Sequence, residues 1–549
     1  MKANKIFMLA TMAVLSMFTI GCTENDELTE IQAANEQEQK NVPSVPSPSL
    51  SDELSATLAA TQGISDVVVE DSINELKNEK YRFYSFNYDQ LIDHTAPSKG
   101  TFKQRVRIRI GKSGLTAPVV LYTHGYNMPD DFKDSYAPEM TNYLDASTLW
   151  VEHRYFGKSQ VDPVKNLEFT YLNADQAAQD LHAIVSLMKQ VVFKQSGKWV
   201  STGISKDGIT TGLYAYYSDK YGWDDIDLYM PFCAPYLEAT PQSCDDPKIG
   251  QYLYKNSGSG YPQGSVEDIA YQRIRQIPTT LLQNKELRDA CLRLYHQKVP
   301  DEYVEVINTY GRDEEKATAG LLNNYFMSLF DKFSYILFKK WAPLVPEISD
   351  TERMAEFILM DKNDLQAYIK QLESSALDYN NYQYVAEVET KEPRAMTDQE
   401  ILAFWDITPE MPYYVQAARE LGNIRLDLSS LNGLNFPGSS NDFAFLAASV
   451  SHQFEVSVLY QRYAHQWDGG QLMKSFRQWG KTQDKFNMIF CYSANDPWTG
   501  GAIDESTNPR VKRFICKNGV HDDNFLDSDY YSEAEKQQLI GYVRSYLGI

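Results

Sequence analysis

The stretch TGISKDGITTGLYAYY, residues 202–217, places a serine on a turn between an apolar strand and a helix. A strand that runs directly into a helix through so sharp a turn forces strained backbone angles on Ser205 and holds its hydroxyl clear of neighbouring atoms. The small residues Gly203 and Gly208 make the turn sterically possible. The stretch therefore predicts an exposed nucleophilic serine. A plain strand-to-helix turn is the alternative, because so short a motif is weak on its own.

The helix that follows the serine supplies the second part of the pattern. Its N-terminus points at Ser205, so the Lys206 amide is the expected first donor to an oxyanion formed there. The second donor is expected from the loop after the strand PVVLYTHG, as the backbone amide of Gly125 or Tyr126. Asp207 stands where the common form of this turn has glycine, and its carboxylate would oppose an oxyanion unless it points away.

Two further segments end in residues that complete a catalytic set. Asp496 follows the apolar strand in MIFCYSANDPWTGG, and His521 follows the next strand in RFICKNGVHDDN. Serine, acid and histidine in this chain order, each just past a strand end, are typical of the nucleophilic triad of α/β-hydrolases. A turn or helix-capping role is the alternative for Asp496. Asp522 and Asp523 stand too close to His521 in sequence to orient its ring.

The rest of the chain has the periodicities of an α/β protein. Between residues 80 and 160, alternating segments give way to continuous apolar runs, which predicts outer antiparallel strands followed by a covered parallel sheet. A strand, a long helix, the strand KWVST and the helix after Ser205 form a βαβα progression. Between about 240 and 405 the pattern changes to helices broken by proline-containing turns. Together these features predict an α/β-hydrolase fold with a large helical cap insertion.

The sequence divides into segments of different character. Residues 23 to about 65 are polar and acidic, with the stretch NVPSVPSPSLS in the middle, and cannot bury enough apolar surface to fold. Two helix starts carry capping-box residues, Asn173 with Gln176 and Ser532 with Glu535. The predicted segments are a signal peptide at 1–22, a disordered tether at 23–65, the first part of the hydrolase core at 66–240, the helical cap at 241–405 and the second part of the core at 406–549.

The first residues have the layout of an export signal. Two lysines precede the apolar run from Ile6 to Ile20, and Gly21-Cys22 follows, as in bacterial lipoproteins whose cysteine becomes the lipidated N-terminus. An ordinary secretory signal or an uncleaved anchor is the alternative. The acidic TENDELTE after Cys22 is similar to the signal by which some Gram-negative lipoproteins reach the outer face of the outer membrane. We therefore expect an exported lipoprotein of the outer membrane, displayed at the cell surface if that signal acts.

Charge and cysteine content exclude several partners. The 74 acidic and 52 basic residues give a formal charge of −22, which repels phosphate backbones. Nucleic acid is therefore excluded as a partner, and membrane contact is expected only through the N-terminal lipid. The cysteines other than Cys22 have no spacing suited to zinc, so neither a metal nor another cofactor is predicted. Cys491 and Cys516 precede Asp496 and His521 by equal distances, which fits either a disulfide or two buried thiols.

Several separate motifs, in the right order from about residue 80 to the C-terminus, carry a family resemblance. They are QLIDHTAPSKGTFKQRVRI, VVLYTHGYN, VEHRYFGKSQ, YLNADQAAQDL, GISKDG, PYYVQAARELG and NDPWTGG. Together they resemble bacterial prolyl tri/tetrapeptidyl aminopeptidases, which are secreted serine peptidases related to lysosomal Pro-Xaa carboxypeptidase and dipeptidyl peptidase II. The resemblance implies an exopeptidase that acts on free N-termini of short peptides, often after proline, with Ser205, Asp496 and His521 as its triad.

An aminopeptidase needs a carboxylate to pair with the substrate's ammonium group. Glu152 in VEHRYFG is the candidate, with pairing to Arg154 or another core cation as the alternative. Trp498, beside Asp496, is the candidate wall of the substrate pocket, with plain packing as the alternative. Two rival functions remain. A carboxylesterase or lipase would use the same triad, and a surface lipoprotein that lost the chemistry would serve as a binding module, for which Asp207 is the best support.

Overall fold

The structure is a computed structural model. It describes residues 48–74, 79–129, 139–161, 167–238, 262–298, 342–359, 411–422, 462–494, 496–517 and 531–549, and the single residues 398, 402, 405, 519 and 521. The predicted signal peptide and Cys22 lie outside these ranges. No helix within them combines the length and the apolar character needed to cross a membrane.

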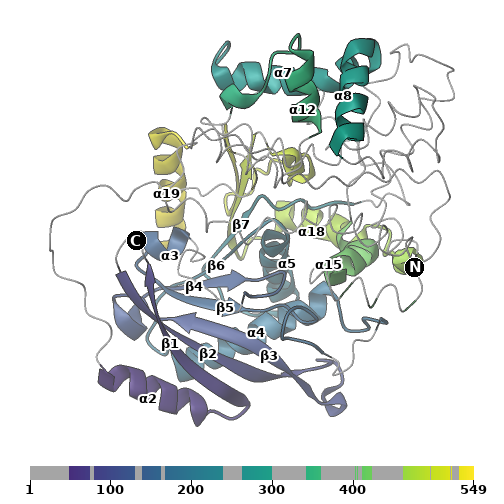
Figure 1. The fold of residues 1–549 in the computed structure, drawn as a ribbon. Coiled ribbons are helices and arrows are strands. Elements are labelled where there is room, and N and C mark those ends of the chain that lie inside the picture. The colour runs from purple at the N-terminus through teal and green to yellow at the C-terminus, as the bar shows by residue number, and fades with distance from the viewer. Residues whose placement is uncertain are drawn as a thin grey trace.

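A mixed sheet forms the centre of the protein (Figure 1). Its strands are β1 (Ile64–Asn74), β2 (Glu79–Leu91), β3 (Thr101–Arg109), β4 (Val119–Thr123), β5 (Ser147–Val151), β6 (Trp199–Ile204), β7 (Leu228–Phe232), β8 (Asn487–Ser493) and β9 (Val511–Cys516). They lie in the order β1-β2-β3-β5-β4-β6-β7-β8-β9. The pairs from β1 to β5 are antiparallel, and all pairs from β5 to β9 are parallel. This confirms the predicted change along the sheet.

Helices cover the two faces of the sheet because the parallel strands are apolar on both faces. Every residue of β4, β5 and β7 is buried. One core cluster joins the sheet to α4, α5 and α18, and another joins it to α3 and α19. The helices are α2 (Pro48–Ala59), α3 (Glu139–Tyr143), α4 (Ala174–Val191), α5 (Lys206–Tyr221), α7 (Val266–Gln283), α8 (Lys285–Lys298), α12 (Thr351–Ile358), α15 (Met411–Gln416), α18 (Gln471–Thr482) and α19 (Glu533–Leu547), with the π-helical turn η7 (Ala417–Leu421) and the 3₁₀ turns η3 (Pro97–Lys99), η4 (Gly114–Thr116), η6 (Ala342–Leu344), η9 (Ala464–Gln466) and η10 (Pro497–Gly501).

The two predicted capping boxes differ in outcome. At the start of α19, Ser532 accepts the Glu535 N–H and Glu535 accepts the Ser532 N–H, so this box is complete. At the start of α4, the Asn173 side chain accepts the Gln176 N–H at 2.9 Å as predicted. The Gln176 side chain does not return the bond, because its Oε1 accepts the His94 N–H at 3.0 Å. It thereby ties α4 to the turn after β2.

The predicted disordered tether at 23–65 is wrong in its last part. Residues from Pro48 form α2, and β1 begins at Ile64 rather than at 66. Leu54 and Leu58 are 4% and 0% exposed and join the core. These two leucines lie four residues apart on one helix face, and that spacing anchors a segment whose composition is otherwise polar.

The equal spacing of Cys491 and Cys516 from Asp496 and His521 does not bring the two cysteines to one level of the sheet. In the β8–β9 register Cys491 pairs with Phe514, and Cys516 pairs with Ser493. The two cysteines are thus offset by two positions, and both are buried free thiols. The alternative of two buried thiols is confirmed.

The predicted cap, 241–405, is described only in part. Within it the structure places α7, α8, η6 and α12, and its described residues form no strand. Figure 1 shows these helices grouped together and apart from β1 to β3. An ion pair of 2.6 Å between Arg293 Nη2 and Glu352 Oε1 links α8 to α12. The limits of the cap and its position over the site remain predictions.

Candidate active site

Ser205 lies on the strained turn that the sequence predicts. It has φ 57° and ψ −120° between β6 and α5, and φ is positive in few other non-glycine residues of the described chain. Its N–H donates to the Phe232 carbonyl at 2.8 Å, which fixes the turn to the end of β7. A Cβ on Gly203 would come within 2.6 Å of the Asp207 backbone, and one on Gly208 within 2.7 Å of the Phe232 carbonyl oxygen. Both glycines are therefore required by close backbone approach.

Asp496 and His521 meet at the same edge of the sheet. His521 Nδ1 lies 2.9 Å from Asp496 Oδ2, with the Asp496 side chain fully buried and the His521 side chain 11% exposed. The second carboxylate oxygen accepts the Trp498 N–H at 2.9 Å, so Asp496 also caps η10. The capping alternative for Asp496 is confirmed, and its catalytic role remains a prediction. An acceptor on Nδ1 favours the tautomer with the proton on Nδ1, in which Nε2 is the basic nitrogen.

The strand order places all three predicted triad residues at one edge. Ser205 follows β6, Asp496 follows β8 and His521 follows β9, and β6 to β9 are parallel neighbours. The carboxyl ends of parallel strands lie at one edge, which is where α/β sheets carry their sites. The catalytic triad itself remains a prediction. The Trp498 ring, 8% exposed, lies 6.3 Å from the His521 ring between centroids, in keeping with a wall of this site.

Asp207 turns toward the loop after β4. It is fully buried, and its Oδ1 accepts the Gly125 N–H. The prediction of Gly125 as an oxyanion donor is therefore wrong for this conformation, because its amide is bound to a carboxylate. The neighbouring amide of Tyr126 and the Lys206 amide at the start of α5 remain the predicted donors. Asp207 thus ties the start of α5 to the loop that carries Tyr126.

The side chain of Lys206 is buried among aromatic rings at the start of α5. Its Nζ lies 5.3 Å from the Phe156 ring centroid and 5.9 Å from that of Tyr126. The Lys206 residue is 2% exposed. Burial, together with the Lys206 charge, holds the pKa of nearby His153 well below its usual value. His153 is therefore neutral, and one buried cation stands directly behind the nucleophilic turn.

Glu152 is bound within the protein and is wrong as the predicted partner of a substrate ammonium group. Its Oε1 accepts the Met128 N–H at 2.7 Å, and its Oε2 accepts the Lys158 N–H at 3.0 Å and the Ser159 hydroxyl at 2.8 Å. Arg105 Nη1 lies 3.9 Å away. Burial raises the Glu152 pKa, and these four contacts oppose that shift. The carboxylate ties together two loops beside the site.

The charged residues around Glu152 form a buried framework. Arg154, fully buried, makes a bidentate pair with Asp180 of α4 at 2.7 and 2.6 Å. His94 Nε2 lies 2.8 Å from the same carboxylate. Lys99 Nζ lies 2.8 Å from Asp93 Oδ2, and that contact holds the Asp93 pKa well below its usual value. The motifs DHTAPSKG and EHRYFG therefore connect the turn after β2 to α4, and their charged residues form this buried framework.

Sequence reasoning missed Cys233. It follows β7, between the strand of the serine and the strand of the acid, with φ 48°. The potential ligand atoms of Cys233, Asp496 and His521 lie within 4.8 Å of one another. No sequence spacing could reveal this group, because more than 250 positions separate Cys233 from the other two. The pairing of β7 with β8 and of β8 with β9 brings them together.

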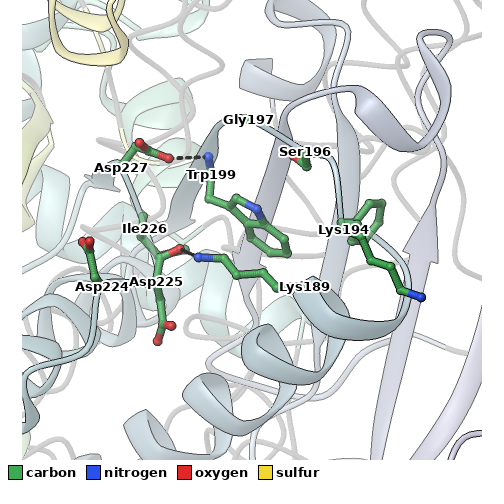
Figure 2. Close-up of a pocket in the computed structure, with 10 residues that line it drawn as sticks. Lys189, Lys194, Ser196, Gly197, Trp199, Asp224, Asp225, Ile226 and Asp227 are labelled. Atoms are coloured by element: carbon green, nitrogen blue, oxygen red, sulfur yellow. Dashed lines mark hydrogen bonds between the residues drawn. The ribbon is translucent and has the colours of Figure 1, made fainter.

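A pocket of about 300 Å³ lies at the opposite edge of the sheet (Figure 2). Trp199 and Asp227, at the amino ends of β6 and β7, belong to its wall, and Lys189 of α4 reaches into it. The Asp227 carboxylate accepts the Trp199 N–H at 2.8 Å, and Lys189 Nζ donates to the Asp225 carbonyl at 2.5 Å. These two bonds hold the amino ends of the strands in place, and no predicted site residue lines the pocket.

The chain is similar to known peptidases. Residues 61–240 match the PS-10 peptidase S37 family. A prolyl tri/tetrapeptidyl aminopeptidase from Streptomyces mobaraensis is 22% identical over 477 residues, which cover 85% of this chain and 81% of that protein. The serine protease vicPb of Bipolaris victoriae (strain FI3) is 27% identical over 180 residues, 29% of this chain and 34% of that protein.

Solved α/β-hydrolases resemble the structure at low similarity. The peroxisomal α/β-hydrolase Lpx1 of Saccharomyces cerevisiae covers 85% of this chain and 90% of its own length, with 10% identity and a TM-score of 0.35. The esterase LipA of Xanthomonas oryzae covers 90% and 94%, with 11% identity and a TM-score of 0.30. The fold assignment itself depends on the strand order and the nucleophilic turn. With the match of residues 61–240 to the S37 peptidases and the relative that spans most of the chain, the protein is a serine hydrolase that is similar to this peptidase family.

Proposed function

We propose that this serine hydrolase is an aminopeptidase that releases short, proline-containing peptides from free N-termini, with Ser205, His521 and Asp496 as its triad. The observation that carries the proposal is the 2.9 Å contact of His521 Nδ1 with the buried Asp496, at the sheet edge that also holds the strained Ser205. A buried carboxylate that orients a histidine at the edge of a nucleophilic turn is the arrangement that acyl transfer requires.

The chemistry follows from these positions. His521 Nε2 accepts the Ser205 proton while the hydroxyl oxygen attacks the scissile carbonyl, and it then gives that proton to the leaving amine. Asp496 holds the ring and stabilises the imidazolium. The Lys206 and Tyr126 amides donate to the oxyanion, and the N-terminal end of α5 adds its dipole. Water then attacks the acyl-enzyme by the same proton path in reverse.

The substrate class has two supports. The relative that covers most of the chain is a prolyl tri/tetrapeptidyl aminopeptidase. The formal charge of −22 attracts the ammonium end of a free peptide and repels anionic ligands. Because Glu152 is bound inside the protein, the carboxylate that pairs with the substrate ammonium must be another. The helical cap would exclude long or folded chains from the site.

Export is the second part of the proposal. The N-terminal signal pattern and Cys22 support an exported lipoprotein, held in the outer membrane by its lipid and displayed at the cell surface. An outer-membrane position would give the enzyme access to short peptides outside the cell. Metabolic labelling with a radioactive fatty acid tests the anchor: wild type should be labelled and Cys22→Ala should not. Equal labelling of both would refute it.

A panel of chromogenic di-, tri- and tetrapeptides, each with a free or an acetylated N-terminus, tests the activity. We expect cleavage of free peptides with proline before the cut, and at least ~100-fold less of acetylated ones, since the ammonium pair is then lost. Ser205→Ala should abolish cleavage. Ser196→Ala, which removes a hydroxyl bonded to the Ala117 carbonyl at 2.9 Å at the other edge of the sheet, should not.

The same panel separates the rival functions. Cleavage of short acyl esters without any peptide would establish a carboxylesterase in place of the aminopeptidase. A fluorophosphonate reports on the triad alone, because it modifies only a serine activated by its histidine. If it labels neither wild type nor Ser205→Ala, the chain is a binding module that lacks the chemistry, and the triad proposal fails.

A further inference from the structure

Cys233 brings a sulfur to the centre of the proposed triad. Its N–H donates to the Cys491 carbonyl at 2.8 Å, which holds the turn after β7 against β8. Cys233 and Asp496 are 1% and 0% exposed, and His521 reaches them from β9 with its side chain 11% exposed. A thiol, a carboxylate oxygen and a ring nitrogen thus lie within 4.8 Å of one another.

These three ligand types form a known class of metal site. Zn²⁺ takes cysteine sulfur at about 2.3 Å and histidine nitrogen or carboxylate oxygen at about 2.1 Å, in tetrahedral geometry. Ligand atoms around such an ion are about 3.3 to 3.8 Å apart, as follows from those bond lengths. His521 Nδ1 and Asp496 Oδ2 are now 2.9 Å apart. Shifts of about 1 Å in side-chain position would therefore form a three-ligand site with one open position.

We propose that Cys233, Asp496 and His521 bind a thiophilic divalent cation, Zn²⁺ above all, and that the bound cation switches off hydrolysis. The cation takes the imidazole and carboxylate that orient the proton transfer, so His521 can no longer accept the Ser205 proton. The thiol proton leaves to water as the sulfur–metal bond forms, and the ring proton of His521 moves from Nδ1 to Nε2 as the cation takes Nδ1. The inhibitory part rests on the triad proposed above, whereas the binding part does not.

The soft sulfur decides which ions bind. Thiolate favours Zn²⁺ and Co²⁺ over Mg²⁺ and Ca²⁺, which prefer all-oxygen sites. The sequence alone predicts no metal, because no cysteine–histidine spacing marks this group and only the strand order forms it. An exported enzyme whose proton path doubles as a cation site would be active only where such ions are scarce.

Direct binding tests the site without any substrate. The full chain, stripped with EDTA and dialysed, is titrated with Zn²⁺ by calorimetry, and with Co²⁺ while the thiolate-to-metal absorption band is recorded. We expect one Zn²⁺ per chain and a Co²⁺ band, both lost in Cys233→Ser. Cys291→Ser, a buried cysteine of α8 far from the triad in sequence and element, is the matched control and should keep both. Mg²⁺ should give no heat of binding.

Several results would overturn the site. One is the absence of Zn²⁺ binding in wild type. Another is Zn²⁺ binding and a Co²⁺ band in Cys233→Ser that equal those of wild type. If Cys233→Ser does not fold, Cys233→Ala takes its place, and a wild-type chain that binds Zn²⁺ without a thiolate band would itself refute the assignment.

Activity tests the inhibitory half. Zn²⁺ should reduce wild-type cleavage at least ~10-fold with recovery on EDTA, and Cys233→Ser should need about 100-fold more Zn²⁺. Binding without inhibition would refute the switch. If the chain cleaves no peptide or ester at all, the aminopeptidase proposal fails, and the calorimetry and Co²⁺ band still decide the cation site.

Discussion

The two edges of the same sheet differ in backbone strain and in the side chains that they bring together. At the carboxyl edge, Ser205 and Cys233 have positive φ and a buried carboxylate contacts a histidine. At the amino edge lies a pocket of about 300 Å³, and none of its residues, all in the described part of the chain, is a non-glycine with positive φ. Backbone strain and buried charge therefore mark the carboxyl edge, where the predicted site residues lie.

The largest expected contrast compares two carboxylates that each accept a backbone N–H. Asp496 accepts from Trp498, and Asp227 accepts from Trp199. Asp496→Asn should lower kcat about 10⁴-fold, because the histidine loses the partner that fixes its tautomer. Asp227→Asn should leave kcat within about twofold, since only a half-exposed pair with Lys198 is weakened. Steady-state kinetics on purified variants measures both, and equal losses would erase the distinction between the edges.

The second contrast places the same substitution at the two ends of β6. Gly203→Ala drives a Cβ into the Asp207 backbone, whereas a Cβ at Gly197 meets nothing within 4 Å. Gly203→Ala should therefore lose about 3 kcal/mol of stability and about 100-fold in kcat/KM as the turn moves. Gly197→Ala should change the free energy of unfolding by less than about 0.5 kcal/mol. Denaturant melts and kinetics decide, and a fully active Gly203→Ala would contradict the required close approach.

The third contrast uses pH. Glu420 accepts the Ala174 N–H at 2.7 Å at the start of α4, on the carboxyl side of the sheet, and burial raises its pKa to about 7. The folded state therefore binds a proton that the unfolded state has already lost above its ordinary pKa of 4.5. Stability should fall by up to about 3 kcal/mol as pH rises from about 4.5 to 7, and stay low above that range.

Glu420→Gln isolates this contribution from that of the other acids. Glutamine keeps the acceptor for Ala174 and for Gln416, which donates to the same oxygen at 2.8 Å. The variant should match wild type near pH 5 and exceed it at pH 8 in the free energy of unfolding from urea melts. Parallel curves for the two proteins would show that Glu420 does not take up this proton.

The smallest contrast lies behind the amino edge. Tyr214 donates to Asp225 Oδ2 at 2.7 Å in a fully buried position. Tyr214→Phe should cost about 1 to 2 kcal/mol of stability and leave kcat unchanged. Tyr221→Phe is the control, because its exposed hydroxyl makes a bond of the same length to Asp175 and its loss should be nearly neutral. A kcat that falls in Tyr214→Phe would give the amino edge a role in catalysis.

The fold could be predicted from the sequence where the signal is local. The strained turn at Ser205, the strand runs of β2 to β5 and the capping box of α19 depend on neighbouring residues, and each is present. The helix α2 could not be predicted in the same way. Its two buried leucines are diluted by polar neighbours, and the partner strand β1 that buries them is a tertiary feature.

The site could be predicted only in its chain order. Asp496 and His521 follow strands, and their contact at 2.9 Å depends on the pairing of β8 with β9. Glu152, Gly125 and Cys233 show why the rest was out of reach. Glu152 is bound by Ser159 and Met128, Gly125 is bound by the Asp207 carboxylate, and Cys233 is placed by the β7–β8 pairing. Each of these contacts depends on residues distant along the chain or on the direction of a side chain, and composition determines neither.

The pairing of β7 with β8 also determines how late the proposed site is assembled during synthesis and folding. Leu228 pairs with Asn487, and almost half of the chain lies between them. When β6 and Ser205 have been synthesised, the nascent chain still lacks β8 and β9, which Asp496 and His521 follow. Long-range pairing of this kind forms late and slowly. With the triad proposed above, the polypeptide therefore cannot hydrolyse a substrate until its last strands have joined the sheet.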